Sequence, residues 1–296
     1  MSPSFALPSF AKINWTLRVL GRRNDGFHEL FTVFQTVSLH DTLHFEVGES
    51  IEFNCDDPAI PEDETNLVVK AAYLLKNATR ADGGARIFLE KRIPSPGGLG
   101  GGSSNAAVTL IALNRLWGLD LPQYELHSLA AELGSDVPFF LHGGTAIGTG
   151  RGEFIEPIDD VLAENLAIVT PAIAVSTKDA FESLNAPTLT FEERDHILPV
   201  CRTEALTLDP RRTALKNDFE RTVFAAHPEI AWVKTTLLEL GAVNAAMSGS
   251  GASVFAIFDN TETRQSAIKA LDDQSTWRKF AVATVGRNEY AQALGL

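Results

Sequence analysis

Five glycines of the chain lie in one short segment, residues 97–102, where their spacing suits phosphate chemistry. The sequence has 22 glycines in 296 residues, so an even spread would place fewer than about one in six positions. A run of glycines lets backbone N–H groups come close to a ligand, and a helix that begins directly afterwards adds the positive end of its dipole. Residues 103–119 have the apolar character of such a helix. The segment therefore predicts a binding site for a di- or triphosphate.

The residues around these glycines exclude three common phosphate motifs. A P-loop needs a lysine at the loop exit, and a dinucleotide loop needs a third glycine there, but this sequence has Ser103. A protein kinase needs HRD and DFG elements, which the sequence lacks. A flexible surface linker is the alternative interpretation, but linkers rarely join a buried-looking strand to so apolar a helix.

Two ionisable side chains elsewhere in the sequence could serve phosphoryl transfer. Residues 11–19 alternate as a half-buried strand does, and Lys12 lies on the polar side of that pattern. The two predicted faces are Ala11, Ile13, Trp15, Leu17 and Val19 on one side, and Lys12, Asn14, Thr16 and Arg18 on the other. A lysine can stabilise a transferring phosphoryl group, and Asp136 could accept the proton of an attacking hydroxyl. Taken alone, Lys12 also fits a solvated strand face and Asp136 an ordinary turn.

The spacing of apolar residues predicts an α+β chain. The first half is expected to form strands at 11–19, 31–39, 42–47 and 85–93, and helices at 63–78, 103–119 and 122–134. The second half is expected to follow the order strand, helices, strand, strand, helix, strand, which is typical of a split βαβ unit of ferredoxin-like type. Residues 185–212 are rich in proline and acidic residues and carry no motif.

Composition and charge limit the partners. The chain has 25 basic and 38 acidic side chains, and 25 − 38 gives a formal net charge of −13, so nucleic acid is not an expected partner. Cys55 and Cys201 are the two cysteines, which favours a reducing compartment without disulfides. The first residues lack the charged and apolar regions of a signal peptide, and no apolar run approaches the ~20 residues of a membrane helix. A cytoplasmic protein that does not bind a membrane is expected.

Four segments, in order, resemble the motifs of the GHMP kinases, a family of small-molecule kinases. They are the glycine segment with its flanks, AKINWTLRVLGRRNDGFHEL (11–30), LGSDVPFFLHGGTAIGTGRGE (133–153), and the pair NDFE (217–220) and SGSGASVFAIF (248–258). The resemblance implies the two-domain GHMP kinase fold. An N-terminal ribosomal-protein-S5-like α/β domain with the ATP loop would span residues 1–158, and a C-terminal ferredoxin-like domain residues 159–296.

The second of these segments resembles most the branch of the family that phosphorylates the 2-hydroxyl of 4-CDP-2-C-methyl-D-erythritol, in the non-mevalonate route to isoprenoids. The motif keeps Asp25, Gly26 and His28, with Phe27 where tyrosine is usual, which retains a stacking ring but loses a hydroxyl. The resemblance implies that Asp136 is the catalytic base, supported by Lys12. A kinase for homoserine or a mevalonate-type acid, or a non-catalytic nucleotide-binding regulator on the same fold, are the alternatives.

The resemblance also implies the roles of the other site residues. The substrate would be bound by Asn14, which orients the methylerythritol hydroxyls, by Phe27, His28 and Phe181 at the cytidine end, and by Ser248, Gly249, Ser250 and Gly251, which close the phosphate site. ATP would be bound by Asn66 and by Pro94, Ser95, Pro96, Gly97, Gly98, Leu99, Gly100, Gly101, Gly102, Ser103 and Ser104. Mg²⁺ should arrive with ATP; its protein ligand is not identifiable, although Ser104 is a candidate. A monomer or weak homodimer is expected, with a small-molecule substrate carrying a cytidine diphosphate group.

Overall fold

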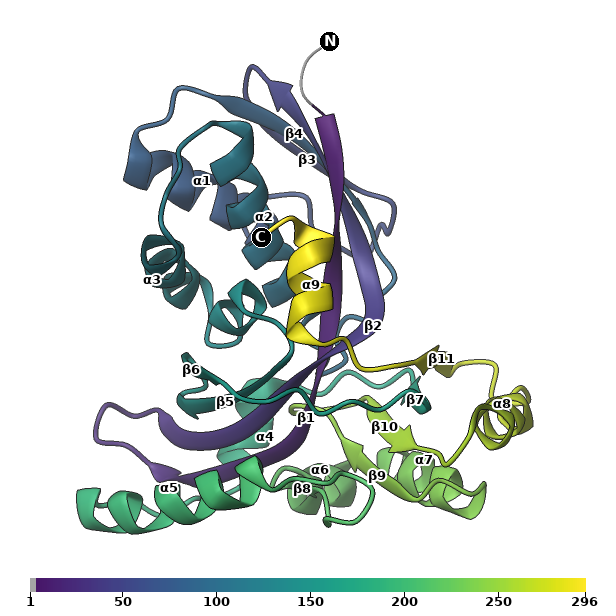
Figure 1. Cartoon of the computed structure of the whole chain (residues 1–296). Helices are drawn as coiled ribbons and strands as arrows, with labels where there is room; N and C mark the ends of the chain where they lie inside the picture. The colour runs from purple at the N-terminus through teal and green to yellow at the C-terminus, as the bar shows by residue number, and fades with distance from the viewer. Residues whose placement is uncertain (1–3) are drawn as a thin grey trace.

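The computed structural model describes residues 4–296 and contains two α+β units, each built on its own sheet (Figure 1). The first sheet has seven strands, in the order β3-β4-β2-β1-β8, with β5 paired to β2 and β6 paired to β5. Its strands are β1 (Ser4–Arg22), β2 (His28–Gly48), β3 (Ile51–Cys55), β4 (Gly84–Glu90), β5 (Thr145–Gly150), β6 (Phe154–Pro157) and β8 (Lys216–Asn217).

Helices of the first unit pack against this sheet and form the largest apolar core with it. They are α1 (Leu67–Thr79), α2 (Gly101–Leu116), α3 (Gln123–Leu133) and a short 3₁₀ helix, η1 (Val137–Leu141). The predicted apolar helix after the glycines is α2, whose residues from Ser104 to Leu113 are all buried. The middle of α2 is therefore fixed inside the first unit, while its first turn, residues 101–103, remains accessible.

The second unit has the predicted ferredoxin-like arrangement. Its sheet has the order β11-β7-β10-β9, and every pairing in it is antiparallel. These strands are β7 (Leu166–Thr170), β9 (Asn244–Met247), β10 (Val254–Ile257) and β11 (Arg278–Val282). The helices that follow β7 are α4 (Thr177–Ser183), α5 (Phe191–Leu206), α6 (Glu220–Ala226), α7 (Pro228–Glu239), α8 (Thr261–Ala270) and α9 (Arg287–Leu294). The fold class expected from the sequence is therefore confirmed.

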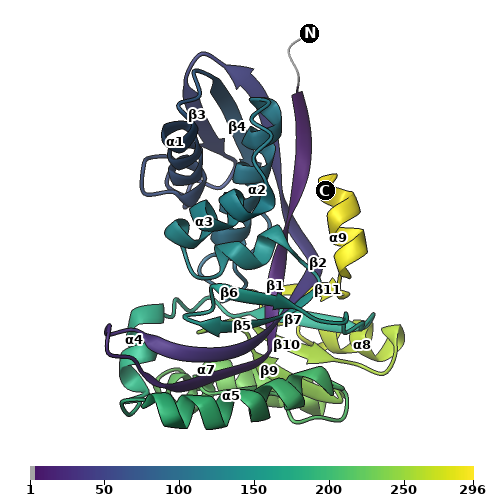
Figure 2. The same cartoon turned by 60° about the vertical axis from the view of Figure 1, so that its left-hand side comes forward.

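Three features join the two units. The strands β1 and β2 are long enough to run from one unit into the other (Figures 1 and 2). An apolar cluster lies between the two sheets, where the Trp15 and Phe255 rings meet edge to face at 5.4 Å. Helix α9 returns to the first unit, where the Tyr290 hydroxyl donates to the carbonyl oxygen of Phe140 at 2.5 Å. The expected domain division at residue 158, one residue beyond β6, stays a prediction.

The predicted alternation along residues 11–19 holds only as far as Trp15. Residue Asn14 pairs with Phe34 and Thr16 with Val33, so Trp15 is the extra residue of a β-bulge. Beyond the bulge the two faces exchange, which corrects the assignment of Leu17 and Val19 to the Ala11 face. Leu17 instead joins the Lys12 side of the strand and packs against the second unit's core.

Residues 191–206, for which the sequence analysis predicted no element, form helix α5. Thr190 and Glu193 form a capping box at its start, with each side chain bonded to the other residue's backbone N–H. The sequence carried this signal, although Pro199 and the scarcity of apolar residues concealed the helix. Within residues 4–296, no helix combines the length and apolar character needed to cross a membrane.

Candidate active site

A cavity of about 350 Å³ lies where the glycine segment, β1, η1 and the second unit meet. It is lined by eleven of the residues that the sequence predicted: Lys12, Asn14, Pro96, Gly98, Gly100, Ser103, Asp136, Phe181, Gly249, Ser250 and Gly251. These residues come from segments far apart in the chain, so the fold itself assembles them. The lining also includes residues that were not predicted, among them Thr32 and Arg151.

Lys12 and Asp136 contact each other at this cavity. The Nζ atom of Lys12 lies 3.4 Å from Oδ2 of Asp136, and the Lys12 side chain is 3% exposed while that of Asp136 is 34% exposed. Strand β1 places the lysine, and the first turn of η1 places the aspartate just before Val137 and Pro138. The lysine is not on a solvated strand face, because α2, η1 and the second unit enclose that side of β1. The carboxylate is open to a ligand.

Asn14 links Lys12 to the second unit. Its Oδ1 atom accepts a hydrogen bond from Lys12 Nζ at 2.8 Å and another from the backbone N–H of Gly249 at 2.9 Å. Its amide nitrogen donates to the Thr32 hydroxyl at 2.7 Å. Asn14 thereby fixes the position of the ammonium group, while one of its two amide hydrogens is used and its side chain lines the cavity, so its role in orienting the substrate hydroxyls stays a prediction.

The glycine segment adopts a conformation that other residues could not reproduce. Gly98 and Gly100 have φ of +72° and +70°, the left-handed region that favours glycine. A Cβ on Gly98 would overlap the carbonyl oxygen of Ser248, and one on Gly100 would come within 2.8 Å of the Phe140 ring. The Ser248 hydroxyl donates to the Gly98 carbonyl at 2.9 Å, so the two glycine-rich loops, one from each unit, contact directly.

The two serines at the start of α2 differ in environment. Ser103 lines the cavity, whereas Ser104 is fully buried and its hydroxyl is bonded to that of Ser9 at 2.8 Å. Asn105 extends this buried network by donating to Ser9 and to Asp41. The structure therefore contradicts the suggestion that Ser104 binds magnesium, because its oxygen faces the interior. Ser103 presents the available hydroxyl.

Asn66 caps a helix instead of lining the cavity. Its Oδ1 atom accepts the backbone N–H of Val68 at 2.8 Å, and its amide donates to the carbonyl oxygen of Pro61 at 2.7 Å. This bonding explains why an asparagine precedes α1. The structure does not place Asn66 among the residues around the cavity, and its role in binding adenosine stays a prediction.

Of the predicted cytidine-binding residues, Phe181 on α4 lines the cavity, whereas Phe27 and His28 lie at the tip of the β1–β2 hairpin and contact the lining residues Arg151 and Phe181. The His28 and Phe181 rings stack with centroids 4.9 Å apart and planes 20° from parallel. The Phe27 ring is 53% exposed, and the Arg151 guanidinium lies 4.9 Å from its centroid. Burial, assisted by the charge of Arg22, lowers the pKa of His28 below its ordinary value. A neutral ring can accept a hydrogen bond from a ligand.

Two residues of the site escaped the sequence reasoning. Arg151 lines the cavity and is held by Glu153, whose carboxylate accepts from the arginine's backbone N–H and, at 3.2 Å, from its Nε. Asn217 donates to the carbonyl oxygens of Met247 and Gly249 at 2.7 and 2.8 Å, which fixes the second glycine-rich loop. Both residues belong to segments that resemble family motifs, GTGRGE (148–153) and NDFE (217–220). Their contacts with Glu153 and with the second glycine-rich loop become evident only in the folded structure.

The arrangement described, with a glycine segment at a helix N-terminus facing a lysine–aspartate pair, matches a known class of kinase. Residues 66–144 match the family described as GHMP kinases N terminal domain, and residues 204–275 match the GHMP kinases C terminal. A homoserine kinase from Cytophaga hutchinsonii shares the fold, with a TM-score of 0.71, 22% identity and coverage of 98% of this chain and 97% of that one. The chain belongs to the GHMP kinases.

Relatives with higher sequence identity identify the branch of the GHMP kinases to which the chain is most similar. The 4-diphosphocytidyl-2-C-methyl-D-erythritol kinase of Solibacter usitatus is 42% identical over 96% of this chain and 90% of its own length. That of Thermodesulfovibrio yellowstonii is 39% identical over 89% and 93%. A crystal structure of 4-(cytidine 5'-diphospho)-2C-methyl-D-erythritol kinase superposes with a TM-score of 0.77 and 33% identity, over 95% of this chain and all of that one. Within the GHMP kinases, the branch is that of the 4-diphosphocytidyl-2-C-methyl-D-erythritol kinases.

Proposed function

We propose that the chain performs its family's reaction, ATP-dependent phosphorylation of 4-diphosphocytidyl-2-C-methyl-D-erythritol, with Asp136 as the base and Lys12 as its cationic partner. The reaction is a step of the non-mevalonate route to isoprenoids. The observation that carries this assignment is the 3.4 Å contact between Lys12 and Asp136, at a cavity lined by the glycine segment and by Arg151 and Phe181, which contact Phe27 and His28 of the hairpin tip. Each end of that cavity suits one of the two substrates.

The glycine segment suits the phosphates of ATP. Gly98, Gly100 and Ser103 line the cavity, and Gly101 begins α2, so backbone N–H groups of the first helical turn are unpaired within the helix. Such groups, together with the helix dipole, attract phosphate oxygens. A chain with a net charge of −13 can bind polyanions in this way, because the positive potential is local.

Asp136 and Lys12 suit the transfer itself. An alcohol is a weak nucleophile, so the enzyme must hold it in line with the γ-phosphate and accept its proton as the O–P bond forms. Asp136 is exposed enough to contact the hydroxyl, and Lys12 lies next to it, where an ammonium group can stabilise the charge on the transferring phosphoryl group. Asn14 keeps that ammonium group in place through its bond to Nζ.

The other end of the cavity suits the cytidine diphosphate part of the substrate. The exposed Phe27 ring offers an aromatic face for a base, and the neutral His28 ring, which stacks on Phe181, can hydrogen-bond the base edge. Arg151 is the second cation of the lining after Lys12, and it lies between the hairpin tip and Asp136 along the cavity wall. We assign Arg151 to the substrate's anionic or polar groups on this side.

Mg²⁺ would bind at this site together with ATP, through the phosphates, rather than at a separate metal site made by the protein. Among the described residues there is no group of three His, Cys, Asp or Glu side chains suited to a metal, and Asp136 supplies the carboxylate of the cavity lining. Magnesium keeps several waters and commonly binds through substrate phosphates and few protein oxygens, so the ATP phosphates and the Ser103 hydroxyl would hold it, and Asp136 stays free to accept the proton. When bound, it neutralises charge on the phosphates. A cytoplasmic location and a monomer or weak homodimer remain our expectations.

An assay with competing substrates tests this function. The purified protein is given ATP and Mg²⁺ with the cytidyl substrate, homoserine or mevalonate, and ADP release is measured for each. We expect turnover with the cytidyl substrate alone and its loss when EDTA removes the metal. Turnover of homoserine or mevalonate without turnover of the cytidyl substrate would contradict the assignment, and no turnover with any would favour a nucleotide-binding regulator.

A further inference from the structure

We propose that residues 181–194, which we call the strap, position the tip of the β1–β2 hairpin for cytidine recognition, and that Arg194 and Glu29 are the positioning residues. The strap runs from Phe181 on α4 through an irregular connection to the first turn of α5. Helix α4 contacts the hairpin through Phe181 and His28, and α5 contacts it through Arg194 and Glu29; Figure 2 shows α4 close to the hairpin tip. The inference rests on the proposed role of Phe27 and His28, and it assigns a role to a region that carries no family motif.

The first contact between strap and hairpin is aromatic. Phe181 stacks on His28 at 4.9 Å, and its other side meets the Phe219 ring edge to face at 4.8 Å. Phe219 is 2% exposed and belongs to the core of the second unit. Phe181 thereby connects His28 at the hairpin tip to the core of the second unit.

The second contact is a short run of backbone pairing. The N–H of Arg22 donates to the carbonyl oxygen of Pro187 at 2.7 Å, and the N–H of Leu189 donates to the carbonyl oxygen of Arg22 at 2.9 Å. The approach is close, because a Cβ on Gly21 would come within 2.7 Å of Leu189 Cβ. The strap therefore acts as an extra strand at the last residues of β1.

The third contact is an ion cluster around Glu29. Its carboxylate is 4% exposed and lies between two arginines, with Arg194 Nε at 3.1 Å and Arg23 Nη1 at 3.2 Å. Arg23 also pairs with Asp25 at 2.9 Å, and Asp25 Oδ1 accepts the backbone N–H of Phe27 at 3.1 Å. A continuous series of bonds thus leads from α5 to Phe27. A buried carboxylate with two cationic partners is strongly localised, since leaving it unpaired would be costly.

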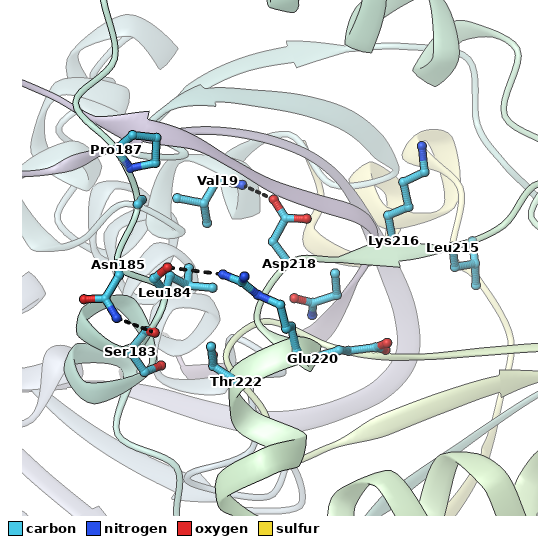
Figure 3. A pocket seen from close by; sticks show the side chains of 13 residues that line it. Val19, Ser183, Leu184, Asn185, Pro187, Leu215, Lys216, Asp218, Glu220 and Thr222 are labelled. Atoms are coloured by element: carbon cyan, nitrogen blue, oxygen red, sulfur yellow. Dashed lines mark hydrogen bonds between the residues drawn. The ribbon is translucent and has the colours of Figure 1, made fainter.

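The connection within the strap lines a second cavity. Figure 3 shows this cavity, of about 900 Å³, lined by residues 183–187 on one side and by Asp218, Glu220 and Thr222 on the other. Across this cavity, Arg221 Nη2 donates to the carbonyl oxygen of Leu184 at 3.2 Å. Asp218 Oδ2 accepts the backbone N–H of Val19. Where the connection lines this cavity, the bond to Leu184, the pairing with Arg22 and the Glu29 cluster hold the strap in place.

Binding of CDP and of ADP, measured separately by calorimetry, tests the proposal. Arg194→Met removes one partner of Glu29 and keeps the unbranched stem of the side chain. We expect the Kd for CDP and the KM for the cytidyl substrate to rise about 5- to 30-fold, the equivalent of about 1–2 kcal/mol, while the Kd for ADP stays unchanged. Arg194→Lys keeps the charge and should recover part of the loss, and Glu29→Gln should reproduce it.

The matched control is Glu204→Gln. Glu204 lies on the same helix and pairs with Arg18 at 3.4 Å, away from the hairpin tip, so its loss should leave both Kd values unchanged. If Arg194→Met lowers the melting temperature but leaves CDP binding intact, or weakens CDP and ADP binding equally, the proposal is wrong. If the wild-type protein binds ADP but not CDP, the proposed function fails instead, and the two failures are distinguishable.

Discussion

The ammonium group of Lys12 lies 3.4 Å from the carboxylate of Asp136, and the two side chains are anchored by different parts of the fold. Lys12 is bonded through its own N–H to the carbonyl oxygen of Leu99, so the lysine and the glycine segment also move together. The pair is therefore held in register with the phosphate loop before any ligand binds. Preorganisation of this kind reduces the reorganisation needed in the transition state.

Replacement of the base should affect the chemical step. Asp136→Asn keeps the shape of the side chain but removes its ability to accept a proton, so we expect kcat to fall by about 10²–10⁴. The Kd for ATP should change little, because the glycine segment is untouched. Single-turnover kinetics and nucleotide titration check this. An unchanged kcat would remove Asp136 from the mechanism.

Two glycines of the same loop should respond in opposite ways to alanine. Gly98→Ala would force a Cβ into the Ser248 carbonyl at a positive φ, so we expect weaker ATP binding and a lower melting temperature. Gly102→Ala is the control, since its Cβ would meet Leu67 at an ordinary 3.6 Å within α2. Alanine there should leave stability unchanged or raise it by about 0.5–1 kcal/mol. Similar losses at both positions would contradict the loop geometry described above.

Removal of an aromatic face at the hairpin tip should separate the two substrates. Phe27→Ala should raise KM for the cytidyl substrate several-fold and leave KM for ATP unchanged, because Phe27 lies on the hairpin rather than beside the glycine segment. Tyr124→Ala, which removes another exposed ring, on α3, is the control. Steady-state kinetics with each substrate varied in turn checks this. Equal changes in both KM values would argue against a cytidine-binding role.

Two histidines should make the fold less stable in mild acid. Burial lowers the pKa of His28, with help from Arg22, and burial lowers that of His142, with help from His127 and Arg287. The unfolded chain therefore binds protons more readily, near the ordinary value of 6.5. Their contribution to stability is complete above that pH and is lost as the pH falls through the lowered folded values.

Urea denaturation between pH 7.5 and pH 5 measures this loss. The midpoint of the wild-type transition should decrease as the pH falls, and His142→Gln, which cannot take up the proton, should decrease less. An equal decrease in both proteins would show that other groups are responsible.

The sequence predicted most of the site because the relevant signals are local. The glycine crowding, the Lys12 strand and the Gly-Ser-Asp-Val-Pro segment each depend on neighbouring residues, and all three meet at the cavity. The β-bulge at Trp15 was not predictable in this way, because it arises from the pairing of β1 with β2. Burial of Ser104 depends on Ser9, which is distant in the sequence. Helix α5 was missed although its capping box was visible.

The return of α9 to the first unit has a consequence for how the protein is made. Tyr290 is fully buried and lies 5.5 Å from the Phe10 ring, yet it is synthesised after the whole second unit. During synthesis, the parts of Phe10 and Phe140 that contact Tyr290 stay exposed until α9 has been translated and can pack against the first unit. A nascent fragment ending after β6 would therefore expose an apolar patch, and completion of the earliest core is coupled to the last helix translated.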